Sequence, residues 1–136
     1  MEMKGGCLCG AVRITLSSPV ALAEFCHCTT CRRATGAPVM AWAGVARHGV
    51  EIEGKTLQRF ESTPAVERTF CGRCGTSLTI WDRNHPDHVY VAIAALKEAE
   101  SCAPEVHIWR SERLSWIETS DSLPRYARFK RDGVTE

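Results

Sequence analysis

Cysteines in three tight groups dominate the chemistry that this 136-residue chain could perform. In chain order the groups are Cys7 and Cys9; Cys26, Cys28 and Cys31; and Cys71 and Cys74. Zinc takes four thiolates in a closed structural site, whereas three protein ligands leave one position open for water or a substrate. Seven clustered thiols therefore divide naturally into a closed site and an open one, and function would lie at the open site.

The segment 71–75, Cys-Gly-Arg-Cys-Gly, is the strongest single signal. Two thiols at this spacing can bind one ion from a tight turn, and the following glycine can take the positive φ that such a turn needs. Cys7 and Cys9 would face one side of an extended chain, so they could join this pair in a four-thiolate structural site. Spacing alone also permits Cys26 and Cys28 as the partners. We prefer Cys7 and Cys9 because the central triplet then stays intact.

Two other interpretations of the cysteines remain open at this point. One is a single zinc ion with spare buried thiols, and the other is an iron–sulfur cluster, which also takes thiolate ligands. A secreted disulfide framework is less favoured. The N-terminus has no apolar run typical of a secretory signal, and no stretch reaches the length of a membrane span, so we expect a cytoplasmic protein with reduced thiols.

The charge balance argues against electrostatic capture of nucleic acid or of an anionic membrane. The formal net charge is only +1, and metal-bound thiolates would lower it. Basic residues do gather in segment 125–131 beside two aromatic residues, where they could contact a phosphate backbone. A solvated tail or a final strand is the favoured interpretation of that segment.

The pattern of apolar residues predicts one domain over residues 1–136 and an all-β fold of short antiparallel strands with little helix. Clean alternation in 11–16 indicates a half-buried strand, and one short helical turn is predicted in 29–35. A brief helix or turn is expected in 96–102. Further strands are predicted at 39–46, 50–52, 57–60, 66–70, 77–81, 89–93 and 106–109.

Several other side chains could take part in the site. His27 stands between two thiols and is expected to point away from the ion, and His107 is expected in the core. Arg32 and Arg33 could meet the carboxylates of a substrate, and Arg68 falls on an apolar strand face without an evident partner. The remaining apolar candidates, all expected to be buried, are Trp42, Trp81, Cys102, Trp109, Trp116 and Ile117.

The motifs resemble a known family when taken together. Segments 6–10 (Gly-Cys-Leu-Cys-Gly), 26–32 (Cys-His-Cys-Thr-Thr-Cys-Arg) and 70–75 (Phe-Cys-Gly-Arg-Cys-Gly) are similar in order and separation to the glutathione-dependent formaldehyde-activating enzymes, whose domain also occurs in centromere protein V. The likeness continues through 104–109, Trp116 and 121–124. It implies a β-tent fold with two zinc sites, a structural one at Cys7, Cys9, Cys71 and Cys74 and a catalytic one at Cys26, Cys28 and Cys31.

A zinc ion held by three thiolates suits a soft fourth ligand such as a substrate thiol. The resemblance implies a carbon–sulfur lyase acting on a small glutathione-like thiol, which forms or cleaves S-hydroxymethylglutathione or a related conjugate. The alternative is a non-catalytic zinc-binding interaction module, which a fourth ligand from His27 or Cys102 would favour. A third interpretation is a nucleic-acid or cytoskeletal partner at the basic C-terminus.

Overall fold

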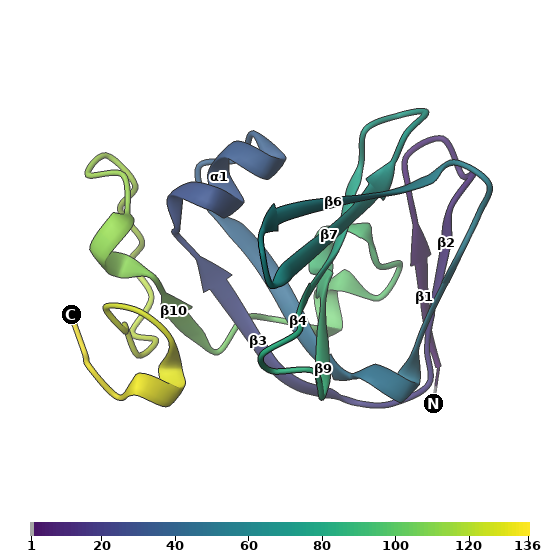
Figure 1. The fold of residues 1–136 in the computed structure, drawn as a ribbon. Coiled ribbons are helices and arrows are strands. Elements are labelled where there is room, and N and C mark those ends of the chain that lie inside the picture. Colours follow the sequence, from purple (N-terminus) through teal and green to yellow (C-terminus); the bar gives the residue numbers. More distant parts are fainter. Residues whose placement is uncertain (1) are drawn as a thin grey trace.

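The computed structural model describes residues 2–136, which are built mainly from β-strands (Figure 1). One α-helix lies in this range, α1 (Thr29–Thr35), and the 3₁₀ helices are Arg47–Gly49, Ile93–Ala95, Ala99–Ser101, Arg110–Glu112 and Lys130–Asp132. The strands are β1 (Met3–Gly6), β2 (Arg13–Leu16), β3 (Val20–Cys26), β4 (Met40–Ala46), β5 (Val50–Glu53), β6 (Leu57–Thr63), β7 (Val66–Cys71), β8 (Ser77–Asp82), β9 (His88–Ala92) and β10 (Val106–Ile108). The predicted mainly-β class with little helix is confirmed.

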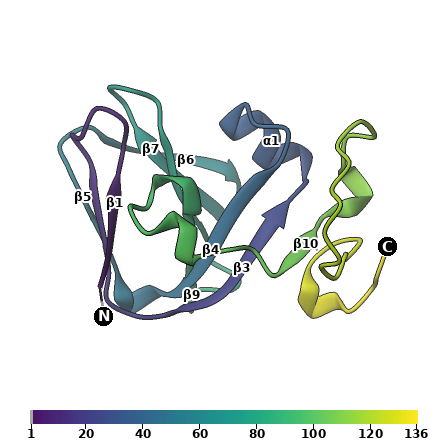
Figure 2. The same ribbon diagram turned by 180° about the vertical axis from the view of Figure 1, so that it is seen from behind.

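Over the described residues 2–136 the strands form two sheets. One has three strands in the order β1-β2-β5, and the other has seven in the order β10-β3-β4-β9-β8-β7-β6. Neighbours are antiparallel as predicted, except that β10 runs parallel to β3. Figures 1 and 2 show the three-stranded sheet at one side of the molecule, with β10 and the C-terminal segment at the other.

The alternating segment 11–16 forms β2, although the strand begins at Arg13 rather than at residue 11. Ile14 and Leu16 are each 1% exposed, whereas the Arg13 side chain is 74% exposed. The two-residue periodicity of the sequence therefore predicts correctly which face of this strand enters the core.

Two expectations differ from the structure. The stretch before the central cysteines, where the sequence analysis predicts no strand, forms β3, in which Ala23 and Glu24 are both buried although they lie on opposite faces. A strand covered on both faces lacks the alternation by which the others are recognised. Trp116 does not return to the core: it is 68% exposed, because it follows a 3₁₀ helix in a loop and has no sheet face to pack against.

The apolar core has two clusters, and each contains cysteines of one predicted metal site. The first includes residues of β2, β4, β8 and β9 together with Cys7 and Cys71, and the solitary Cys102 is buried in the same cluster as expected. The second includes Cys26 and Cys31 together with the buried Trp42. Two cysteines of each group are therefore held in place by the surrounding apolar packing.

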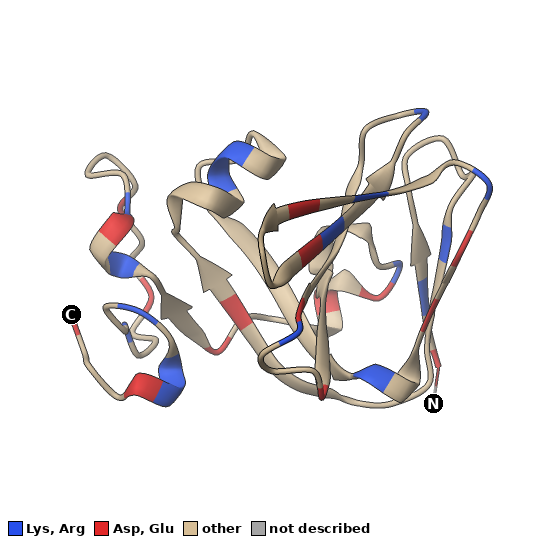
Figure 3. Cartoon of the chain, in the orientation of Figure 1, with Lys and Arg blue, Asp and Glu red and all other residues tan. Residues whose placement is uncertain are grey.

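Charged residues of both signs are spread along the chain (Figure 3). In the C-terminal segment, Lys130 and Arg131 are followed directly by Asp132. Within residues 2–136 no helix combines the length and the apolar character that crossing a membrane requires.

Ile14 supplies a test of this packing. We expect Ile14→Ala to lower the free energy of unfolding by about 2–4 kcal/mol, because a fully buried aliphatic side chain is replaced by a cavity. The neighbouring Arg13→Ala should change it by less than about 1 kcal/mol, since its ion pair with Glu53 is exposed. Urea unfolding of the two variants measures both values, and equal losses would contradict the assignment of the two faces.

Candidate metal centres and the adjoining cavity

The first thiol group joins two turns that are distant in sequence. Cys7 and Cys9 lie between β1 and β2, while Cys71 ends β7 and Cys74 lies in the turn before β8. Their four sulfur atoms all lie within 4.8 Å of one another. We call these residues the four-thiol cluster, and the grouping is the one that the sequence analysis prefers.

Both turns of the four-thiol cluster have the same local design. The Gly10 N–H donates to the Cys7 carbonyl at 3.1 Å, and the Gly75 N–H donates to the Cys71 carbonyl at 2.8 Å. Each glycine has φ of 80°, a left-handed conformation that glycine adopts without steric cost. The glycines after the cysteine pairs thus close the turns that bring the sulfur atoms together.

The sulfur separations fit a tetrahedral metal ion. Cys7 Sγ lies 3.6 Å from Cys9 Sγ, and Cys9 Sγ lies 3.8 Å from Cys71 Sγ. Zinc–sulfur bonds of about 2.3 Å in a tetrahedron place the sulfur atoms about 3.8 Å apart. All eight cysteines are free thiols, so the four-thiol cluster could hold a metal ion.

Two hydroxyl groups favour the thiolate form in this cluster. The Thr56 hydroxyl lies 3.2 Å from Cys71 Sγ and is the main cause that lowers the pKa of this thiol. The Thr76 hydroxyl lies 3.2 Å from Cys74 Sγ and is the main cause that lowers the pKa of Cys74 to about 5. Deprotonated sulfur is the form that binds metals.

The second group, which we call the three-thiol cluster, spans the junction of β3 and α1. Cys26 ends β3, Cys28 is the N-cap of α1, and Cys31 lies in its first turn. Cys26 Sγ lies 3.4 Å from Cys28 Sγ, and the Cys31 N–H donates to Cys28 Sγ at 3.2 Å. The predicted short helix is confirmed, and its N-terminal turn is what directs these sulfur atoms toward one another.

Neither suggested fourth ligand joins the three-thiol cluster. His27 is fully buried, and its Nε2 lies 2.8 Å from Nδ1 of His107, which is also a core residue as expected. Burial, assisted by the charge of Arg110, lowers the pKa of His27 to about 4, so it is neutral near pH 7. Cys102 Sγ donates to Met3 Sδ at 3.6 Å in the other core cluster. Over residues 2–136, the ligand atoms grouped here are the three cysteine sulfurs.

The three-thiol cluster opens onto a cavity of about 420 Å³. This volume is within the range of about 300–1,000 Å³ that small-molecule sites occupy. Trp109, at the end of β10, lines the cavity in a left-handed conformation with φ of 56°, which costs a non-glycine residue about 1–3 kcal/mol. The cavity wall also carries charge of both signs, from Glu24, Arg68, Asp82, Asp87 and Arg131.

Arg68 is the arginine that reaches the thiols. Its Nη2 donates to Cys31 Sγ at 3.5 Å and its Nε donates to Ser62 Oγ at 3.0 Å, although the side chain is only 9% exposed. These contacts supply the partner that the strand pattern leaves unidentified. Arg32 instead bonds to backbone and hydroxyl oxygens near α1, and Arg33 lines a separate cavity.

Glu24 is a buried carboxyl group in the same cavity. It is 6% exposed and lies opposite Trp42 in the register of β3 and β4. Burial raises the pKa of Glu24 to about 7, and negative charge at Cys31 adds to this, while Arg131 and Lys130 oppose it. Sequence reasoning missed Glu24, and the one available signal was an acidic residue inside an otherwise apolar stretch.

The basic segment 125–131 is held within the fold. Arg125 donates to the Thr119 hydroxyl at 2.9 Å and lies 3.6 Å from the Asp121 carboxylate. The guanidinium of Arg131 lies 3.8 Å from the centre of the Phe129 ring. Two of the basic residues therefore have partners inside the molecule.

Comparison with known proteins identifies related sequences. The family of glutathione-dependent formaldehyde-activating enzymes matches residues 2–112 of the chain. An uncharacterized lyase of Schizosaccharomyces pombe is 34% identical over 77 residues, which cover 57% of this chain and only 56% of the yeast protein. A Halomonas elongata protein that carries the name of the glutathione-dependent formaldehyde-activating enzymes is 31% identical over 127 residues, covering 87% of this chain and 81% of the relative.

The fold is also similar to a solved structure. A crystal structure of a Rhodobacter sphaeroides protein superposes with a TM-score of 0.60 at 29% sequence identity. The superposition covers 70% of this chain and 88% of the other.

The raised pKa of Glu24 makes stability depend on pH. The pKa of Glu24 in the fold is about 7, against 4.5 ordinarily. The contribution of this carboxyl group to the free energy of unfolding is therefore complete below about pH 4.5 and is lost as the pH rises through about 7. An amide carries no charge, so Glu24→Gln should gain stability relative to the parent between about pH 5 and about pH 8. The gain should be about 3 kcal/mol at most, because one pKa unit is worth about 1.4 kcal/mol.

Urea unfolding of metal-loaded parent and variant at the two pH values measures this gain. Glu105→Gln, at an exposed position just before β10, controls for the removal of one carboxylate. A relative stability of Glu24→Gln that falls with rising pH would mean that the fold favours the charged carboxylate instead.

Proposed function

Because this chain belongs to the glutathione-dependent formaldehyde-activating enzyme family, we propose that it is a zinc-dependent carbon–sulfur lyase. Its reaction is the formation or cleavage of S-hydroxymethylglutathione, or of a related glutathione conjugate. One observation carries the proposal: three thiols converge at the wall of a cavity without a fourth ligand from residues 2–136.

We assign different roles to the two thiol clusters. Cys7, Cys9, Cys71 and Cys74 would hold a structural zinc ion, because four thiolates complete its tetrahedral shell. Cys26, Cys28 and Cys31 would hold the catalytic ion, because three ligands leave one position open. The thiols must stay reduced for both purposes, so we place the protein in the cytoplasm.

The proposed reaction is a simple addition. The thiol sulfur forms a bond to the carbonyl carbon of formaldehyde, the carbonyl π bond breaks, and the thiol proton ends on the oxygen. Bound at the three-thiol cluster, zinc would supply a soft Lewis acid that favours the thiolate form of the substrate. The reverse reaction breaks the carbon–sulfur bond and returns the proton to sulfur.

The chain's own residues suit a charged peptide thiol. Glutathione carries two carboxylates and one ammonium group, and the cavity presents both arginine and carboxyl side chains to such a ligand. Arg68 and Arg131 could bind the carboxylates, and Asp82 or Asp87 could bind the ammonium group. Trp109 and other aromatic residues form apolar wall that excludes water from the reacting atoms.

Single cysteine substitutions test the division of roles. Cys28→Ser or Cys31→Ser should abolish activity and leave the fold intact, whereas Cys71→Ser should unfold the domain through loss of its structural metal. Cys102→Ser is the matched control at a buried thiol outside both clusters, and it should keep its activity. Turnover assays and circular dichroism measure the two effects, and equal outcomes for Cys31→Ser and Cys71→Ser would remove the distinction.

NMR exchange spectroscopy tests the substrate. Exchange between formaldehyde and S-hydroxymethylglutathione in the presence of glutathione should accelerate on addition of the zinc-loaded protein. The Cys31→Ser protein at the same concentration provides the control for nonspecific effects. An exchange rate equal to that of the spontaneous reaction would exclude formaldehyde and leave other glutathione adducts to be screened.

A further inference from the structure

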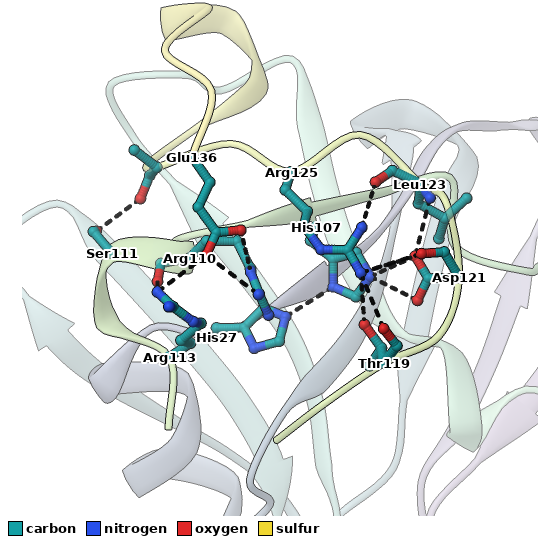
Figure 4. A network of polar contacts seen from close by, with 11 residues as sticks. His27, His107, Arg110, Ser111, Arg113, Thr119, Asp121, Leu123, Arg125 and Glu136 are labelled. Carbon is teal, nitrogen blue, oxygen red and sulfur yellow. Dashed lines mark hydrogen bonds and ion pairs between the residues drawn. The ribbon is translucent and has the colours of Figure 1, made fainter. Parts of the chain in front are cut away.

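A chain of hydrogen bonds runs from His27, which lies between two residues of the three-thiol cluster, through His107 to Asp121 (Figure 4). His27 Nε2 lies 2.8 Å from His107 Nδ1, and His107 Nε2 lies 3.0 Å from an oxygen of Asp121. Both imidazole rings are 0% exposed. We call these three residues the His–His–Asp relay.

The Asp121 carboxylate sets the direction of the outer hydrogen bond in the relay. Partial burial alone would raise the pKa of Asp121, but hydrogen bonds from His107, Leu123 and Thr119 bring it to about 2, so the carboxylate is charged and only accepts. His107 therefore donates to this carboxylate through Nε2. One proton lies between His107 Nδ1 and His27 Nε2, and this hydrogen bond holds the ring of His27 whichever of the two nitrogens carries it.

His27 is fixed at the point where it separates two thiols. It lies between Cys26 and Cys28, whose side chains line the cavity, whereas His27 does not. Its backbone N–H donates to the Ile108 carbonyl at 3.1 Å. The relay adds a second attachment, so both the backbone and the ring of His27 are held.

Asp121, at the far end of the relay, is held in place by neighbouring residues. The Leu123 N–H donates to Asp121 Oδ1 at 3.0 Å, and Arg125 donates to the Leu123 carbonyl at 2.9 Å. The ring of His107 stacks on Phe25 with centroids 4.9 Å apart. Asp121 and its supports come from a part of the chain that follows the family match at residues 2–112.

We propose that His107 and Asp121 are positioning residues, which hold His27 so that Cys26 and Cys28 keep their sulfur atoms directed at one metal position. This inference rests on the proposed function only through the metal at the three-thiol cluster. Partners that orient metal ligands typically contribute about 10-fold to 100-fold in metal affinity. Loss of the Asp121 acceptor would leave a buried N–H of His107 without a partner and release the ring of His27.

The first test is made on the parent protein. Long-range ¹H–¹⁵N NMR of the zinc-loaded chain should show a ring proton between His27 Nε2 and His107 Nδ1 that exchanges slowly with water, because both rings are fully buried. Rapid exchange of this proton with water would mean that the two rings do not share a buried hydrogen bond, and it would overturn the proposal.

The second test separates positioning from general stability. In titrations with cobalt(II), absorption bands distinguish a four-thiolate site from a three-thiolate site with an open position. Asp121→Ala should weaken binding at the three-thiol cluster by about tenfold or more and leave the four-thiol cluster unchanged. Asp121→Asn retains an oxygen that can accept from His107, so it should restore affinity to within about threefold of the parent.

Glu118→Ala is the matched control, because it removes an exposed carboxylate from the same segment. Unchanged cobalt binding in Asp121→Ala would overturn the proposal and leave the proposed function standing. Equal weakening of both clusters would also overturn it, since the effect would then be general. A parent protein that binds one equivalent of cobalt would refute the proposed function and this inference with it.

Discussion

Four sulfur atoms that converge from distant turns are the constraint on which the rest of the fold depends. Cys9 and Cys71 are 62 positions apart, yet their sulfur atoms are 3.8 Å apart. One pair of thiols belongs to the three-stranded sheet and the other to a hairpin of the seven-stranded sheet, so the contact joins the two sheets. Closing so long a loop lowers the conformational entropy of the chain and is unfavourable. A metal ion bound at these four thiols would offset this cost, because its binding free energy would add to the free energy of folding.

The central strands of the seven-stranded sheet position the three-thiol cluster. β3 and β4 lie inside the seven-stranded sheet, and Glu24 and Cys26 stand on the β3 face that lines the cavity. Two residues, His27 and Cys28, connect β3 to α1, and the first turn of α1 contains Cys31. The site is thus built where a rigid strand passes into a helix N-terminus, which places it on regular structure rather than on a loop.

Local features of the sequence were enough to predict both thiol clusters and most strands. Cysteine spacing and the glycines that follow identify the turns, and alternation identifies β2, because both signals depend on residues close together in the chain. Glu24, Arg68 and Asp121 could not be assigned roles in this way. Their surroundings come from strands or turns elsewhere in the sequence, and Arg68, on β7, contacts Cys31, which lies 37 positions earlier in α1.

The charges around the three-thiol cluster have a common origin. Arg68, a nearly buried cation, donates to Cys31 Sγ, and a buried cation is tolerated only where negative charge compensates it. The same negative charge adds to burial in raising the pKa of Glu24. Zinc with three thiolates also carries one net negative charge. Metal binding would therefore still compensate the charge of Arg68 and would still raise the pKa of Glu24. The cavity therefore combines a fixed cation beside the thiols with a carboxyl group that is readily protonated, and this asymmetry suits a thiol whose proton must pass to an oxygen.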